Sequence, residues 1–154
     1  MCVICQSLTS YKERCDYDGL EGIGDFAAFS ENAGDAPASI ATPYSVSVGD
    51  TFDGTLGAGD TDWIAINVVQ GQTYEISLTG IGGSGIADPY MRLYDAEGDY
   101  IGYNDDGGPG LTSFATYTAT YTGVLYVSAE EFNYNAGDYR VTVNAGTAYS
   151  QFTH

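Results

Sequence analysis

From Tyr44 onward, short runs rich in Thr, Val, Ile and Tyr alternate with clusters of Gly, Asp and Asn. Inside these runs apolar and polar residues alternate, so that Tyr74, Ile76 and Leu78 share one face. A period of two is that of a strand with one buried face, and no helical period of adequate length follows residue 40. We expect an all-β fold, a two-sheet antiparallel β-sandwich. The expected strands are Tyr44–Val48, Thr51–Leu56, Asp62–Val68, Thr73–Thr79, Tyr90–Tyr94, Tyr100–Tyr103, Ser113–Thr120, Val124–Ala129 and Tyr139–Asn144.

The 154 residues fit one sandwich domain with an extension at each end. Residues 1–34 are expected to form an arm, with a short helix around Phe26 to Glu31. The sandwich is expected at 35–145, and residues 146–154 form a tail or the start of a linker. Trp63 is expected in the sandwich core.

All three cysteines, Cys2, Cys5 and Cys15, lie in the arm. A structural zinc site needs four ligands, and the only histidine is His154. Two disulfide interpretations remain open. One disulfide within the arm would leave a spare thiol, or a cysteine would pair with a neighbouring chain.

The charge balance excludes several classes of partner. Four Lys and Arg residues stand against 21 Asp and Glu residues, for a net charge of -17. Such a surface disfavours nucleic acid and anionic membranes, and no apolar run reaches the length of a membrane span. The segment Met1–Leu8 is too short and too interrupted for a secretory hydrophobic region. Because the composition favours a secreted, extracellular protein, we expect export without a cleaved N-terminal signal.

Acidic turns next to strand-like runs predict a calcium site. Their carboxylates repel one another, and the few basic side chains cannot neutralise them. Calcium takes six to eight oxygen ligands from flexible loops, so a bound Ca²⁺ would hold these turns together. The alternative is that the same residues only build turns. The candidate ligands are Asp60, Asp62, Asp88, Asp105 and Asp106.

A catalytic constellation is not expected. With His154 as the sole histidine, a Ser–His–Asp or Cys–His arrangement is nearly excluded. The tyrosines allow two interpretations: they line a carbohydrate or protein surface, or they cover strands with the hydroxyl at the rim. The residues concerned are Tyr117, Tyr121, Tyr126, Tyr134 and Tyr139.

An ordered set of motifs is similar to that of a known family. The order is Gly-Asp-x-Asp-Trp at 59–63, Gly-Gln-Thr-Tyr at 71–74, Asp-Pro-Tyr at 88–90, Asn-Asp-Asp at 104–106 and Gly-Asp-Tyr at 137–139. This resembles the bacterial pre-peptidase C-terminal domain over roughly Asp35 to Val143. The resemblance implies a jelly-roll-like, non-catalytic module of secreted proteins that serves secretion or substrate or matrix binding, and several such modules bind calcium. Related collagen-binding modules add acidic and Asn ligands before the first strand, which correspond here to Glu31, Asn32 and Asp35.

The arm resembles the start of marine bacterial proteins in which such a sandwich precedes a serralysin-like metallopeptidase. The residues that carry this likeness are 1–5 and 15–20, and the tail 149–154 would begin the following domain. The zinc motif His-Glu-x-x-His of that peptidase is absent from the sequence.

We therefore expect a secreted, calcium-binding, non-catalytic structural protein that acts in adhesion or self-assembly. The arm and the strand edges suit strand addition between copies, which would give an open filament. The alternative is the N-terminal accessory module of a larger secreted zinc metallopeptidase. A glycan-binding module is a third interpretation, and it requires an exposed aromatic platform that the sequence does not place.

Overall fold

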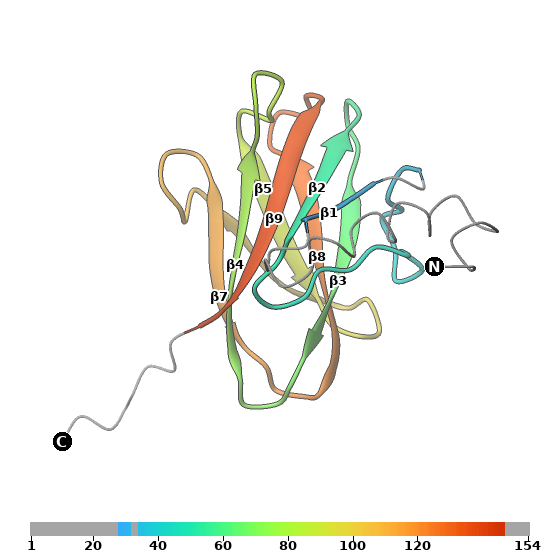
Figure 1. Cartoon of the computed structure of the whole chain (residues 1–154), viewed down its shortest axis with the longest axis vertical. Coiled ribbons are helices and arrows are strands. Elements are labelled where there is room, and N and C mark those ends of the chain that lie inside the picture. The colour runs from blue at the N-terminus through green and yellow to red at the C-terminus, as the bar shows by residue number, and fades with distance from the viewer. Residues whose placement is uncertain (1–27, 32–33, 147–154) are drawn as a thin grey trace, which may run out of the picture.

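A computed structural model describes residues 28–31 and 34–146, which form a sandwich of two packed sheets (Figure 1). The described residues contain strands and turns and no helix, and they therefore include no helix that could span a membrane. The all-β prediction is confirmed. The strands are β1 (Ala28–Ser30), β2 (Thr51–Leu56), β3 (Asp62–Val68), β4 (Thr73–Gly80), β5 (Pro89–Tyr94), β6 (Tyr100–Asp105), β7 (Ser113–Thr118), β8 (Gly123–Glu131) and β9 (Gly137–Ala145).

Strands distant in sequence lie side by side in both sheets. One sheet has the order β1-β2-β9-β4-β7, and the other has the order β3-β8-β5-β6. All pairs are antiparallel except β1, which runs parallel to β2. The strand order places β8 between β3 and β5, and this decides where the acidic residues meet.

The core lies between the sheets and follows the expected alternation. In β4 the three residues predicted to share a face, Tyr74, Ile76 and Leu78, are buried. In β3 the inward-facing residues are Asp62, Ile64, Ile66 and Val68. A carboxylate therefore stands at the start of an otherwise apolar row. The remaining fully buried large side chains are Phe52, Leu56, Met91, Leu125, Val127, Tyr139 and Val141.

Three sequence-based expectations differ from the structure. The predicted strand Tyr44–Val48 contributes only an isolated bridge between Ser45 and Ala65. The expected helix over Phe26 to Glu31 is wrong at 28–30, because those residues pair with the free edge of β2 as a strand. Trp63 is buried, but on the outer face of its sheet, where its ring stacks on Tyr94 instead of joining the central cluster.

One end of the sandwich collects most of the acidic turns. At this end lie the turn between β2 and β3, the start of β5 and the ends of β6 and β8. The strand pairing brings them together, since Asp62 pairs with Ala129, Pro89 with Glu131 and Tyr90 with Asp105. The candidate site therefore lies at this end.

Candidate functional site

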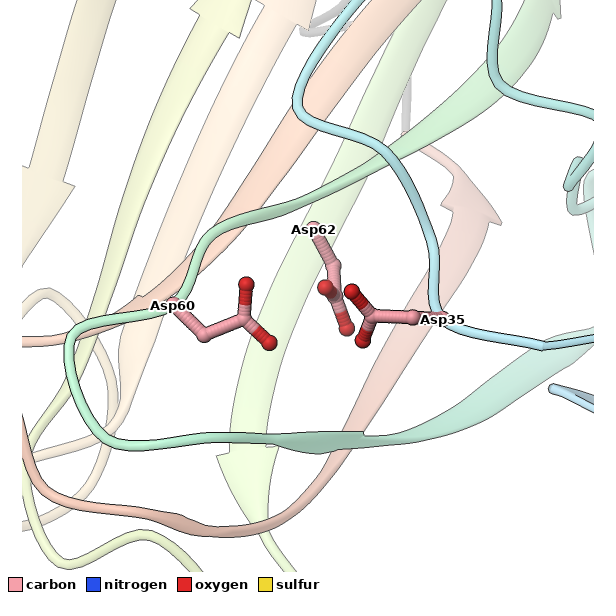
Figure 2. A group of neighbouring side chains, drawn as sticks. All are labelled: Asp35, Asp60 and Asp62. Carbon is pink, nitrogen blue, oxygen red and sulfur yellow. The ribbon is translucent and has the colours of Figure 1, made fainter.

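Three carboxylates converge where β3 begins. Asp62 is the first residue of β3, Asp60 precedes it in the turn, and Asp35 comes from the segment that crosses in front of the strand (Figure 2). One carboxylate oxygen from each lies within 4.8 Å of the others. We call this group the Asp62 triad.

Asp62 is the buried member of the triad, with none of its surface exposed. Its Oδ2 accepts a 2.7 Å hydrogen bond from the Tyr139 hydroxyl. Its Oδ1 is buried and has no hydrogen-bond partner within the described part of the chain. A buried oxygen without a donor costs free energy unless an ion or another donor satisfies it.

The surroundings of Asp62 favour its neutral form when no cation is bound. Burial, the neighbouring Glu31 carboxyl and repulsion by Asp60 together raise the pKa of Asp62 to about 9. The Tyr139 hydroxyl oxygen also lies 3.4 Å from Oε1 of Glu31. A cation among these oxygens would reverse this preference, because it stabilises the ionised carboxylates.

Local backbone geometry holds the triad in place. The two oxygens of Asp60 accept hydrogen bonds from the backbone N–H groups of Gly57 and Thr61, at 3.1 and 2.8 Å, which fixes the turn before β3. On the facing sheet, Gly54 leaves room for the Tyr139 side chain, since a Cβ there would lie 2.3 Å from the tyrosine hydroxyl oxygen. A small residue on β2 thus allows Tyr139 to reach Asp62.

A second group of carboxylates lies at the start of β5 and the end of β6. Asp88, Asp105 and Asp106 also bring one oxygen each within 4.8 Å of the others, and we call them the Asp105 triad. Oδ1 of Asp105 is buried without a hydrogen-bond partner in the described residues. Desolvation raises the pKa of Asp88 and of Asp105, and repulsion by neighbouring carboxylates adds to both shifts. Asp106 adopts a left-handed backbone with φ of 49°, which Asp tolerates better than most residues.

The sequence interpretation placed these aspartates in one site, and the structure divides them into two triads. The reason is the strand order, which inserts the end of β8 between β3 and β5. That end carries Glu131, which the sequence interpretation missed. Glu131 is only 4% exposed, and its Oε1 has no hydrogen-bond partner among the described residues. The alternation of Leu125, Val127 and Ala129 along β8 would have predicted that Glu131 points inward.

The remaining predicted residues divide into described and undescribed positions. Glu31 lies beside the Asp62 triad, whereas Asn32 and the cysteines Cys2, Cys5 and Cys15 lie outside the described residues. Of the five singled-out tyrosines, Tyr126 and Tyr139 are buried and Tyr117 and Tyr121 are half-buried, so only Tyr134 is fully at the surface.

Each triad is suited to chelation by oxygen. The carboxylates of each triad come from two segments of the chain, and calcium takes such oxygen ligands in a flexible geometry. Asp62 has the raised pKa of a general acid, but its complete burial keeps it from any substrate.

Comparison with solved structures supports the expected fold. The pre-peptidase C-terminal domain of a collagenase from Bacillus anthracis aligns with 79% of this chain and 98% of its own, at 20% identity and a TM-score of 0.51. PliG from Aeromonas hydrophila, a periplasmic inhibitor of g-type lysozyme, aligns with 77% of this chain and 100% of its own, at 13% identity and a TM-score of 0.46. CorA, a surface-associated copper-binding protein of Methylomicrobium album BG8, aligns with 79% and 98%, at 10% identity and a TM-score of 0.46. The sequence matches no protein-family model and no curated protein sequence.

The chain is thus a β-sandwich module with two acidic triads at one end. More particularly, it has the fold of the pre-peptidase C-terminal domain, as the order of its motifs predicted.

Proposed function

We propose that the chain is a non-catalytic, calcium-binding module of the extracellular space that acts in adhesion or self-assembly. The observation that carries this proposal is the unpartnered Oδ1 of the fully buried Asp62, which lies within reach of two further carboxylates. Asp35, Asp60 and Asp62 would hold the ion, and Glu31 lies close enough to complete the set.

Calcium would act on the fold and perform no chemistry. Asp35 belongs to the segment before β2, and Asp60 and Asp62 belong to the opposite sheet's first strand and its turn. A cation between them would replace repulsion with attraction, which at 4 Å and an effective dielectric of 20 amounts to about 4 kcal/mol for each charge pair. The ion would thereby fasten the N-terminal segment to the sandwich.

The pairing of β1 with β2 supports a role in assembly. These three residues, at the start of the described chain, add to a sheet edge through a parallel register of Ala28 with Thr51 and Ser30 with Asp53. A segment that adds to an edge within one copy has the geometry needed to add to the edge of another.

An accessory module of a secreted zinc metallopeptidase is the second candidate. It is favoured by the alignment with nearly the whole pre-peptidase C-terminal domain of the Bacillus anthracis collagenase. Calcium binding is common to both candidates, so assembly is what separates them.

Calorimetric melting with calcium, with magnesium and with a chelator tests calcium binding. Calcium should raise the melting temperature and magnesium should not, because magnesium is smaller and releases its waters reluctantly. An identical melting temperature in all three conditions would contradict the proposal.

Light scattering in calcium buffer then tests assembly. A mass above that of one chain supports the structural role, and a monomer supports the accessory role.

A further inference from the structure

The outer face of the β3-β8-β5-β6 sheet carries a row of aromatic rings in two groups, which Arg92 separates. On β5, Tyr90 and Tyr94 lie on the same face with Arg92 between them. Tyr90 stacks on Tyr103 of β6, with ring centroids 5.5 Å apart, and Tyr94 meets the edge of Tyr100 at 6.1 Å. The row continues from Tyr94 to Trp63 and from Tyr90 to Phe132.

Much of this row is open to solvent. Tyr103 is 62% exposed, and Tyr100 and Phe132 are more than half exposed. Trp63 and Tyr126 lie on the same face but are buried, and the Tyr126 hydroxyl donates a hydrogen bond to the carbonyl of Ile40. Rings that are both stacked on a neighbour and exposed, as Tyr103 and Phe132 are, form a rigid surface that is open to a ligand.

A groove of about 340 Å³ lies at one end of the row, and its lining combines rings with paired polar groups. Arg92 and Glu130 form an ion pair there, and the Arg92 guanidinium sits over the Tyr90 ring, 4.8 Å from its centroid. Glu131 forms part of the wall of the groove, but its carboxylate is turned into the protein, where Oε2 accepts hydrogen bonds from the backbone N–H groups of Asn133 and Asn135. Arg92 and Glu130 are therefore the polar groups that a ligand would meet.

Tyr134, at the rim of the groove, is held in an unfavourable backbone conformation. Its φ is 63°, a left-handed value that is rare for a bulky residue and that glycine adopts without steric cost. Its N–H donates to the Glu131 carbonyl and its own carbonyl accepts from Gly59, each at 2.9 Å, and these bonds fix the turn. The side chain is 73% exposed, so it contributes nothing to the core that would offset this strain.

We propose that this aromatic platform binds a neutral glycan. The platform is Tyr90, Arg92, Tyr103, Glu130, Phe132 and Tyr134. The faces of sugar rings present weakly positive C–H groups, which suit the negative faces of aromatic rings. Sugar hydroxyls can donate to Glu130 and accept from Arg92, which is the combination of apolar walls with few directed polar groups that small-molecule sites use.

The charges of the platform decide against other ligands. The Asp105 triad adjoins it, since Asp105 pairs directly with Tyr90, and the whole chain carries a net charge of -17. Both features repel acidic polysaccharides. A cationic ligand is disfavoured because Arg92 already occupies the position over the Tyr90 ring and neutralises Glu130. A neutral, hydroxyl-rich ligand meets neither obstacle.

This inference rests on the proposed role as a binding module, but it does not depend on the calcium site. Titration calorimetry with soluble hexasaccharides of β-linked glucose, β-linked N-acetylglucosamine and α-linked mannose, in calcium buffer, should detect binding of at least one. Tyr103→Ala should weaken that binding at least about tenfold, as expected when a central aromatic contact is removed. Phe114→Ala, which removes an exposed ring from β7 of the other sheet, should leave it unchanged.

Tyr134→Gly separates binding from folding. Because glycine relieves the left-handed strain, the melting temperature of this variant should not fall. Its affinity for the glycan should fall. The inference is overturned if no hexasaccharide binds, or if Tyr103→Ala and Tyr134→Gly bind as the unaltered chain does. It is also overturned if sedimentation shows a dimer that Tyr103→Ala abolishes, since a second copy would then occupy the platform. The calcium response is read from melting temperature and the glycan from heat of binding, so either proposal can fail without the other.

Discussion

Replacing Asp62 with asparagine should stabilise the metal-free protein at pH 8 and should remove most of its stabilisation by calcium. Asparagine keeps the size of the side chain and an oxygen that can accept from the Tyr139 hydroxyl, but it cannot ionise. In metal-free buffer the folded chain holds a proton on Asp62 up to a pKa of about 9, whereas an unfolded aspartate releases it near 3.8.

The sign of the pH dependence follows from that difference. A pKa raised by folding contributes stability that is present below 3.8 and is lost as the pH rises toward about 9. The loss is about 1.4 kcal/mol for each pH unit, or up to about 4 kcal/mol between pH 5 and pH 8. The Asp62→Asn variant lacks this term, so in metal-free buffer it should be the more stable protein at pH 8.

Calcium should offset much of this difference. A ligand at about 100 times its dissociation constant stabilises the folded state by about 2.7 kcal/mol, and the variant should lose most of this gain. Urea denaturation at pH 5 and pH 8, with and without calcium, measures the free energy of unfolding of each protein in all four conditions. Asp99→Asn, at an exposed position in the turn between β5 and β6, is the matched control and should behave as the unaltered chain. Equal calcium stabilisation of Asp62→Asn and the unaltered chain would refute the reasoning.

Three further substitutions test the supports of the site. Tyr139→Phe removes the hydroxyl that donates to Asp62 and should cost about 1–3 kcal/mol of unfolding free energy in metal-free buffer, measured in urea. Gly54→Ala should cost a similar amount, about 1–3 kcal/mol, because its Cβ would overlap Tyr139; a neutral result would show that the ring moves aside freely. Arg140→Gln breaks only the half-exposed pair with Asp53, so thermal melting should reveal a loss below about 1 kcal/mol that shrinks further in high salt.

The strands were predictable because their signal is local. β2 and β3 have the predicted bounds, and most of the others differ by one or two residues at their ends. Alternation and turn residues act within a few positions of the chain, so they survive whatever the strand later pairs with. The segment Tyr44–Val48 failed this rule, because strand-like residues there found only one bridging partner.

The aromatic platform was less predictable than the acidic turns. Five tyrosines were singled out from the sequence, yet only Tyr134 lies in the platform, and Tyr90 and Tyr103 were not among them. Whether a tyrosine on a strand points to the core or to solvent depends on which face of the sheet is covered. Tyr139 and Tyr103 both lie on strands, but Tyr139 is buried and Tyr103 is exposed for this reason.

The sequence by itself determined a β-sandwich, the positions of its strands and the acidic character of its turns, since these follow from side-chain alternation and residue type. The tertiary structure alone decided that the aspartates form two triads, that Asp62 is buried with an unpaired oxygen, and that Tyr90 and Tyr103 stack on the open face. Each of these depends on the strand order, which sets distances between residues far apart in the chain, and no local pattern records that order.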